Sequence, residues 1–329
     1  MKYILGIDTS CYTTSLACVS LEGKLLLSKQ KLLSVPDGAR GLQQSSAVFS
    51  HLRNLPELSA TMQDSLPDGE LVAICASIKP RPYKDSYMPV FVVGESLGAT
   101  LAKLAGVPFY TTTHQENHIM AGLYSNDRMQ MEKHFLALHL SGGTTELLEV
   151  WAHTTGFDIN LIGSTQDLHA GQLVDRIGVA LGLGFPSGPN LEALAEKADK
   201  PIHIPYYVKD LTVSFSGSES HAQRLIAKNA DKAGIARGVY QVLNKTICKW
   251  LENAADKGYP TSVLLVGGVS SSMILREELN VQLRKAGKNM SLYFALPQLS
   301  KDNAVGTAYL GLKAYMNDKY KAGAGLPLK

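Results

Sequence analysis

A pair of histidines spaced four residues apart is the first feature of the sequence that could do chemistry. His114 and His118 lie in the segment 114–123, which has a helical pattern, and residues four apart project from one face of a helix. Two imidazoles on one face can share a metal ion, and a carboxylate from elsewhere would complete a set that suits Fe(II) and also holds Zn(II). The candidate is Asp302, beside Asn303 at the start of a predicted last helix. The alternative is two ordinary histidines on a polar helix face, and Asp302 could be an N-cap instead of a ligand or in addition to being one.

A metallopeptidase would require a different spacing around the first histidine. In the zincin pattern a glutamate follows that histidine directly and acts as the base beside the metal, whereas Gln115 stands at this position here. The metallopeptidase interpretation is therefore weakened.

Three loops follow apolar strands: one at 8–14 that is rich in hydroxyl groups, and two at 141–145 and 267–272 that are rich in both glycine and hydroxyl groups. Glycine lets backbone N–H groups approach phosphate oxygens closely, and a following helix adds its positive end. None of the loops matches the P-loop or the dinucleotide fingerprint, and each alone would more often be a plain turn. Together they predict a site for a nucleotide of the ATP or AMP type. The candidate binding residues are Ser141, Gly142, Gly143, Gly267 and Gly268, and the catalytic candidates, in the first loop, are Asp8 and Ser10.

A polar row at Asp167, Gly171 and Asp175 has the spacing of one helical face. Carboxylates there could accept hydrogen bonds from ribose hydroxyls or hold Mg²⁺ through water, and the alternative is a solvated helix face. The rigid loop 185–189, which contains Gly188, could shape a nucleotide pocket or end a helix. The segment 214–218 is predicted to be a loop, and it lacks the GxSxG pattern of a nucleophile site.

The elements that must position these residues alternate between strands and helices. Strands are predicted at 3–7, 15–19, 71–76, 107–110, 135–140, 146–150 and 262–266, and helices at 90–105, 114–123, 170–183, 190–198, 235–257, 271–286 and 302–315. A hairpin with a hydroxyl-rich turn opens each half, which suggests an internal duplication. We therefore predict an α/β protein with two duplicated, actin-like lobes and a nucleotide cleft between them. The first lobe would span 1–112 and be completed by the C-terminal helix 303–329, and the second would span 113–302.

The composition is that of a soluble globular protein. The chain has 329 residues, of which 45% are hydrophobic and 19% charged, and a formal net charge of +3. So mild a charge favours, by itself, a small-molecule enzyme over an RNA enzyme. The four cysteines (Cys11, Cys18, Cys75 and Cys248) are scattered and are expected to be reduced. Because the sequence has neither a signal-peptide pattern nor an apolar run that could cross a bilayer, we expect a cytoplasmic protein without membrane contact.

Taken together, these motifs resemble the TsaD/Gcp family, once called O-sialoglycoprotein endopeptidases, which has an actin-like fold. The resemblance spans nearly the whole chain and rests on the segments 6–11, 114–118, 141–143, 167–175, 185–189, 214–217, 267–270 and 302–303. It implies that His114, His118 and Asp302 hold one Fe or Zn ion and that Ser141–Gly143 lies beside the metal and the phosphates. It further implies that the sugar and base of the nucleotide are enclosed by Asp167, Gly171, Asp175, Gly188, Gly267 and Gly268.

The resemblance also implies an activity. The family transfers threonylcarbamoyl from its adenylate to N6 of the adenosine beside the anticodon of certain tRNAs, so the expected partners are threonylcarbamoyl-AMP and tRNA. A paralogous actin-like subunit or a second copy of the chain is a further expected partner. The sequence departs from the family pattern at Tyr12-Thr13, at Lys79–Asp85, at Thr144 and at Ser272.

These departures leave three alternatives to a tRNA-modifying transferase. One is a paralogue with another carbamoyl or acyl acceptor, in which Lys79 and Arg81 meet an anionic substrate. Another is a non-catalytic partner of a true transferase, and the metallopeptidase comes last.

Overall fold

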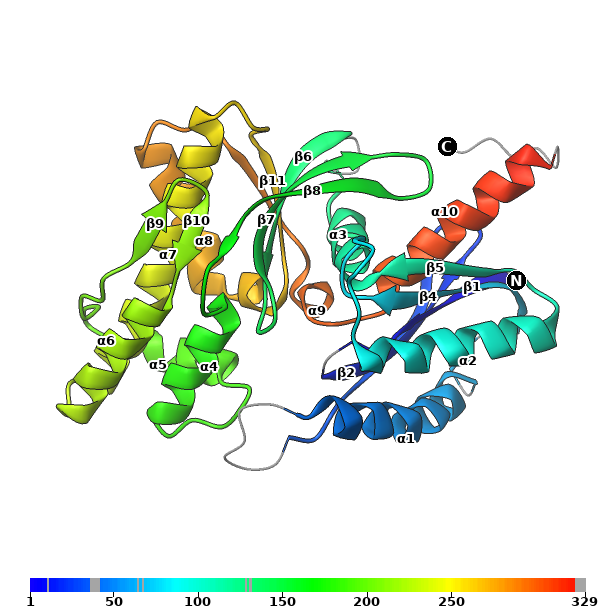
Figure 1. Cartoon of the computed structure of the whole chain (residues 1–329), viewed down its shortest axis with the longest axis horizontal. Coiled ribbons are helices and arrows are strands. Elements are labelled where there is room, and N and C mark those ends of the chain that lie inside the picture. Colours follow the sequence, from blue (N-terminus) through cyan, green and yellow to red (C-terminus); the bar gives the residue numbers. More distant parts are fainter. Residues whose placement is uncertain are drawn as a thin grey trace.

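Two mixed β-sheets, each covered by helices, form the two halves of the molecule (Figure 1). The computed structural model describes residues 1–10, 12–35, 42–63, 65–66, 68–127, 129 and 132–322. Cys11 and residues 323–329 of the predicted C-terminal helix lie outside the described residues.

The first sheet has five strands in the order β3-β2-β1-β4-β5. Its strands are β1 (Lys2–Asp8), β2 (Thr13–Ser20), β3 (Leu25–Leu32), β4 (Glu70–Lys79) and β5 (Phe109–Thr113). Strands β1 to β3 are joined as antiparallel neighbours, whereas β4 and β5 run parallel to β1. The short turns between the first strands allow antiparallel pairing, and the helical connection after β4 allows a parallel one.

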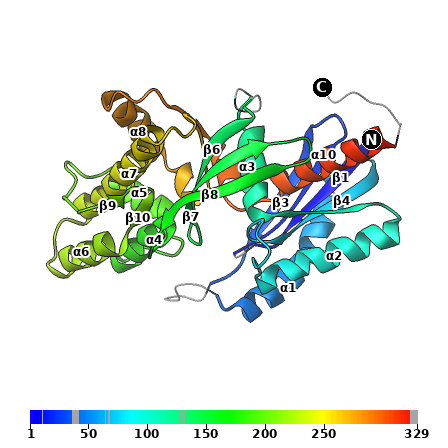
Figure 2. The same cartoon turned by 45° about the horizontal axis from the view of Figure 1, so that its top comes forward.

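Alternate side chains of β2 divide the first sheet between two layers of helices. Leu16 and Cys18 pack in a cluster with α1 (Gln44–Gln63) and α2 (Pro89–Ala105) on one face. Ala17 and Val19 pack in a cluster with α10 (Val305–Lys321) on the other face. This period of two is that of a strand buried on both faces. Figures 1 and 2 show α1 and α2 together on one side of the sheet.

The second sheet repeats the order of the first and extends it. Its order is β12-β11-β6-β7-β8-β10-β9, so that β8-β7-β6-β11-β12 corresponds to β3-β2-β1-β4-β5. Here too the first three strands are antiparallel and the next two are parallel. The strands are β6 (His134–Leu140), β7 (Thr145–Ala152), β8 (Phe157–Thr165), β9 (Tyr207–Lys209), β10 (Thr212–Ser214), β11 (Ser262–Val266) and β12 (Ser291–Phe294). This repetition confirms the predicted duplication and fold class.

Helices α3 (His114–Tyr124) and α10 lie in contact between the two sheets (Figure 2). Ile119 of α3 packs in a cluster with strands of the second sheet, while Ala308 of α10 packs in a cluster with the first. The outer face of the second sheet is covered by α4 (Ala170–Ala180), α5 (Gly188–Ala195), α6 (Ser216–Ala227), α7 (Lys232–Asp256) and α8 (Met273–Lys285). Helix α3, which carries His114 and His118, is therefore held between the two sheets.

Several elements differ from the sequence predictions. The sequence did not predict β3, α1, β8, β9, β10 and β12. The segment 214–218 was predicted as a loop, and this is wrong for its second half, because α6 begins at Ser216. The last helix begins at Val305, not at Asp302, after the short elements η2 (Gly268–Ser271) and α9 (Pro297–Ser300).

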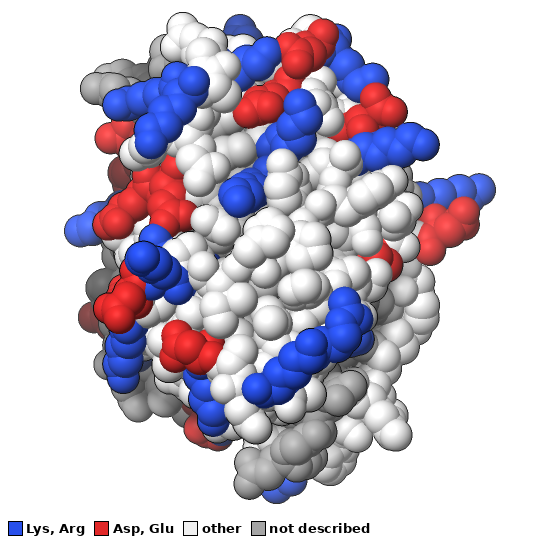
Figure 3. Space-filling model, turned by 90° about the vertical axis from the view of Figure 1, so that its left-hand side faces the viewer, with Lys and Arg blue, Asp and Glu red and all other residues white. Residues whose placement is uncertain are grey.

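The surface carries both signs of charge. On the side shown in Figure 3, Lys and Arg side chains lie among Asp and Glu over a largely uncharged surface. Among the described residues, no helix is long and apolar enough to span a membrane.

Candidate metal and nucleotide site

The turn from β5 into α3 places the first histidine at the start of a helix. Thr113 is the N-cap, and its side chain accepts a hydrogen bond from the backbone N–H of Glu116. The Glu116 carboxylate in return accepts the Thr113 N–H at 3.0 Å, which completes a capping box. His114 is therefore the first helical residue, and His118 follows one turn later on the same face.

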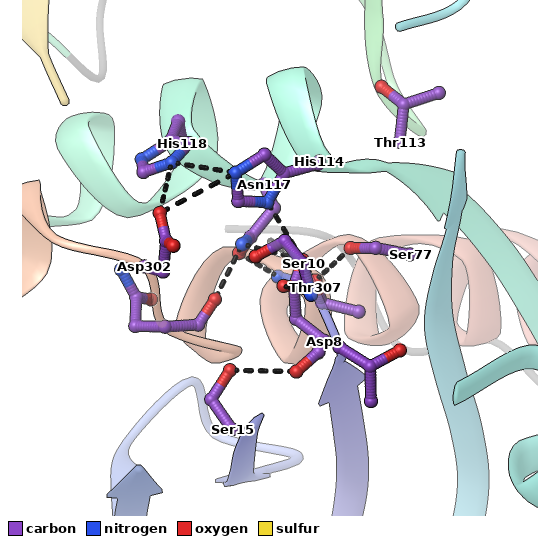
Figure 4. Close-up of polar contacts among 12 residues, drawn as sticks. Asp8, Ser10, Ser15, Ser77, Thr113, His114, Asn117, His118, Asp302 and Thr307 are labelled. Carbon is purple, nitrogen blue, oxygen red and sulfur yellow. Dashed lines mark hydrogen bonds and ion pairs between the residues drawn. The ribbon is translucent and has the colours of Figure 1, made fainter. Parts of the chain in front are cut away.

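Two imidazoles and one carboxylate converge at this helix (Figure 4). The Nε2 atoms of His114 and His118 are 3.1 Å apart, and Asp302 Oδ1 lies 3.6 Å from the first and 3.4 Å from the second. One donor atom from each residue can be chosen so that all lie within 4.8 Å of one another. Two nitrogens and an oxygen at such distances fit an Fe(II) or Zn(II) ion.

A buried carboxylate orients the first imidazole. Asp8 is fully buried at the end of β1, and its Oδ2 lies 3.0 Å from His114 Nδ1. Asn117 donates to the same oxygen, and the Ser10 N–H donates to Oδ1. A carboxylate bound to the other ring nitrogen is the usual outer partner of a metal-ligating histidine. The structure thus places Asp8, a predicted catalytic candidate, behind His114.

In the absence of a metal ion, Asp8 and His114 each stabilise the charged form of the other. Burial alone would raise the pKa of Asp8, but the charge of His114 and the hydrogen bond with its ring lower it to about 2. Burial alone would lower the pKa of His114, and the Asp8 carboxylate raises it above its ordinary value. The hydroxyl of Ser10, the other catalytic candidate, is buried and has no hydrogen-bond partner among the described residues.

A side-chain amide ties the histidine helix to the segment that carries Asp302. Asn117 donates to the Asn303 carbonyl at 2.5 Å and accepts the Thr307 N–H at 2.8 Å. Asn303 in turn accepts the N–H of Val305, the first residue of α10. The alternative N-cap role for Asp302 is therefore wrong, and its carboxylate faces the histidines.

The loop Ser141–Thr145 connects β6 to β7 and lies against the start of α4. The Ser141 carbonyl accepts the Gly171 N–H at 3.0 Å, and the Thr145 hydroxyl accepts the Ala170 N–H at 2.8 Å. A Cβ added to Gly171 would lie 2.6 Å from the Gly142 nitrogen, so glycine permits this close packing. A Cβ on Gly142 or Gly143 would meet nothing within 4 Å, which leaves room for a ligand beside the loop.

The third loop begins beside the second. Strands β6 and β11 run parallel as neighbours, with His139 opposite Val266, so their carboxyl ends meet at one edge of the sheet. Gly267 has a φ of 91° and packs against the Leu140 carbonyl, whereas Gly268 faces open space. Ligands of open α/β sheets bind at such an edge, and its two glycine loops are therefore suited to bind phosphate.

The predicted polar row on one helical face is wrong. Asp167 lies before α4, and its carboxylate accepts hydrogen bonds from the hydroxyls of Ser214 and Ser216, each at 2.5 Å. Asp175 does lie on α4, where it accepts the Ser187 N–H at 2.7 Å and where burial raises the pKa of Asp175. Spacing alone could not show that the helix begins only at Ala170.

Gly188, predicted from the rigid loop 185–189, is the first residue of α5. Its carbonyl accepts a hydrogen bond from the Tyr240 hydroxyl at 3.1 Å, and a Cβ there would meet only one side-chain atom, at 3.9 Å. Gly188 and Asp175 are therefore joined through the turn that contains Ser187.

An ion pair that the sequence did not predict joins the two halves of the molecule. Arg81 follows β4, and its Nη2 lies 2.7 Å from Oε1 of Glu146 on β7. The side-chain amide of Gln115 on α3 donates to Oε2 of the same carboxylate at 2.8 Å. Lys79 donates to the carbonyl of Tyr83. The charge of Arg81 is thus paired within the chain.

The other departures from the family pattern have structural roles. Thr13 begins β2 and donates its N–H to the Ser10 carbonyl, and Thr144 accepts the Ser141 N–H within the glycine loop. Ser272 caps α8 by accepting the Leu275 N–H.

Comparison with known proteins identifies the family to which this site belongs. The family described as TsaD, tRNA N6-adenosine threonylcarbamoyltransferase, matches residues 86–309. Two tRNA N6-adenosine threonylcarbamoyltransferases from strains of Thermus thermophilus are each 31% identical over 312 residues, which cover 92% of this chain and 89% or 88% of theirs. The chain belongs to this family. The matched segment contains both histidines and Asp302.

Solved structures of lower identity share the fold. They include HypF of T. kodakarensis (TM-score 0.61, 15% identity, 96% of this chain and 48% of that chain). The activator of 2-hydroxyisocaproyl-CoA dehydratase from Clostridium difficile with bound ADPNP has a TM-score of 0.55 and 12% identity, and 99% of each chain is covered. A ROK family glucokinase from Streptomyces griseus, in complex with glucose and AMPPNP, has a TM-score of 0.53 and 14% identity, over 94% of this chain and 99% of that chain. These similarities confirm an actin-like fold.

Proposed function

We propose that the protein transfers threonylcarbamoyl from threonylcarbamoyl-AMP to N6 of the adenosine beside the anticodon of tRNA. The observation that carries this proposal is the convergence of His114, His118 and Asp302 in a member of the threonylcarbamoyltransferase family. Two relatives at 31% identity bear the name of this activity, and two of the solved structures of the same fold contain an ATP analogue.

The roles of the residues follow from their positions. An Fe(II) or Zn(II) ion held by His114, His118 and Asp302 would act as a Lewis acid and template for the adenylate. Asp8 fixes the ring of His114 through Nδ1, which would leave Nε2 free to bind the ion. The Ser141 N–H is bound to the Thr144 carbonyl, so the Ser141 hydroxyl and the N–H groups of Gly142 and Gly143 would bind the phosphate together with the Gly267-Gly268 turn. Both loops have open space beside a glycine.

The nucleotide would extend from the phosphate loops toward α4 and α5. Gly171 holds α4 against the phosphate loop, and Asp175 and Gly188 are joined through Ser187 beside it. Asp167 fixes the segment that enters α6. We propose that these residues form the pocket for sugar and base, and that their carboxylates could also bind Mg²⁺.

The transfer itself needs no covalent protein intermediate. The N6 amine attacks the carbamoyl carbon, the bond from that carbon to the phosphate oxygen breaks, and AMP leaves as one proton is lost from the amine. The protein lowers the barrier by holding the amine and the adenylate in this geometry. We also propose that the first lobe comprises 1–112 and 303–329 and that the second comprises 113–302; the presence of two separate sheets supports this division. A paralogous subunit or a second copy is an expected partner.

The test is reconstitution of the reaction. We expect modified adenosine, detected by mass spectrometry of the digested tRNA, when the purified protein is incubated with threonine, bicarbonate, ATP, the adenylate-forming enzyme and tRNA. If no product forms alone or with an added paralogous subunit, although the protein binds its metal, the transferase proposal is wrong.

A further inference from the structure

A third histidine lies in the core beside the proposed ligands. His139 is on β6, is only 2% exposed, and has no role in the site as described so far. Neither of its ring nitrogens has a hydrogen-bond partner among the described residues. A buried polar group without a partner is unfavourable, so two such atoms on one ring call for a ligand that the protein itself does not supply.

The His139 ring packs directly against the His118 ring. The ring centroids of His139 and His118 are 4.6 Å apart with a tilt of 54°. The Nδ1 atom of His118 is also buried and without a partner in the described part of the chain. On another side, the Cδ2 atom of His139 packs against Gly267, where an added Cβ would lie 3.0 Å away. His139 therefore contacts both His118 and the glycine turn proposed to bind phosphate.

The chemistry of a neutral imidazole suits a cation at this position. The His139 ring is almost fully buried, and neither nitrogen has a carboxylate partner among the described residues. The neutral ring offers a nitrogen lone pair, and the nearly complete burial of His139 admits only a very small ligand. The nitrogens of His139 are not among the ligand atoms that lie within 4.8 Å of one another, so the ring must rotate about its Cβ–Cγ bond to reach the ion. This rotation breaks no hydrogen bond, because neither nitrogen makes one with the described residues.

We propose that His139 is an additional ligand of the ion held by His114, His118 and Asp302, so that the site has three imidazoles and one carboxylate. This inference rests on the metal site of the proposed function and deepens it. Four protein ligands of this kind complete a tetrahedral Zn(II) site, and a five-coordinate ion would still have one position for the adenylate.

The test measures how many histidine side chains bind the ion. The protein is loaded with Zn(II) and examined by extended X-ray absorption fine structure, in which outer-shell carbon scattering reports the number of bound histidines. We expect three in the wild type, two in His139→Leu and three in the control His134→Gln. The control residue begins the same strand but pairs with Glu149 at the surface. Competition with a chelator of known affinity should show Zn(II) binding about 10- to 100-fold weaker in His139→Leu only.

The outcomes separate this inference from the proposed function. Metal-free His139→Leu should unfold at no lower temperature than the wild type, because leucine removes two unsatisfied atoms, so weaker binding would not reflect misfolding. A count of two imidazoles in all three proteins, or no Zn(II) binding by the wild type, overturns the inference. Transfer to tRNA with a count of two refutes only the role of His139, whereas a count of three without transfer refutes only the function.

Discussion

The ion pair between Arg81 and Glu146 should couple the stabilities of the two lobes. Glu146 is 6% exposed and has two donors, Arg81 and Gln115. Replacing Arg81 by methionine leaves a buried carboxylate with one neutral donor. Removing one partner costs about 3–5 kcal/mol when an ion pair is fully buried, whereas an exposed pair contributes about 0–1 kcal/mol. Because the Arg81 side chain is 32% exposed, we expect about 2 kcal/mol for Arg81→Met.

A double-mutant cycle measures this coupling. The free energy of unfolding is obtained from urea titrations, followed by far-ultraviolet circular dichroism, for the wild type, Arg81→Met, Glu146→Gln and the double variant. We expect the double variant to be more stable than the sum of the single effects predicts, by about 1–2 kcal/mol. The exposed pair Lys31–Glu57 is the control, with a coupling below about 1 kcal/mol. Additive effects at Arg81 and Glu146, within about 0.5 kcal/mol, would refute the inter-lobe pair.

Three further predictions concern pH, packing and metal. Burial lowers the pKa of His51 from its ordinary 6.5 to about 4, so the folded state binds fewer protons than the unfolded one. The stability that neutral His51 contributes is therefore fully present above about pH 6.5 and is lost as the pH falls toward 4. Between pH 7 and pH 5, the free energy of unfolding from urea titrations should fall by about 2 kcal/mol more for the wild type than for His51→Leu. Equal losses in the two proteins would contradict this. Gly171→Ala should lower the free energy of unfolding by about 1–3 kcal/mol, because the added methyl group would collide with the loop at Gly142. Gly142 faces open space, so Gly142→Ala should leave the free energy of unfolding nearly unchanged but should weaken the binding of an ATP analogue, as measured by calorimetry. Zn(II) at about 100 times its Kd should stabilise the wild type by about 2.7 kcal/mol in thermal unfolding and should leave His114→Ala unaffected; an equal shift in both would place the ion elsewhere.

The sequence predicted well what depends on neighbouring residues. Both hairpins were found because apolar strands flank a short turn, and their repetition suggested the duplication that the strand orders confirm. The common face of His114 and His118 follows from helical spacing alone. Helix α1 was missed, since Pro56 lies inside it and its apolar pattern is weak.

Features that depend on distant contacts or on an exact helix start could not be predicted in this way. Asp8 reaches His114 across 106 residues, a separation at which no local pattern exists. The row of Asp167 and Asp175 failed because spacing fixes a helical face only once the start of the helix is known. The pairing of Arg81 with Glu146 could not be predicted either, because Glu146 lies on a strand of the other sheet.

The transfer assay on metal-stripped protein tests the central claim most directly. Wild-type protein treated with a chelator should form no modified adenosine on tRNA and should recover when Fe(II) or Zn(II) is returned, whereas His118→Ala should bind no ion and form no product under either condition. Equal amounts of product before and after removal of the metal, or full activity of His118→Ala, would contradict the account.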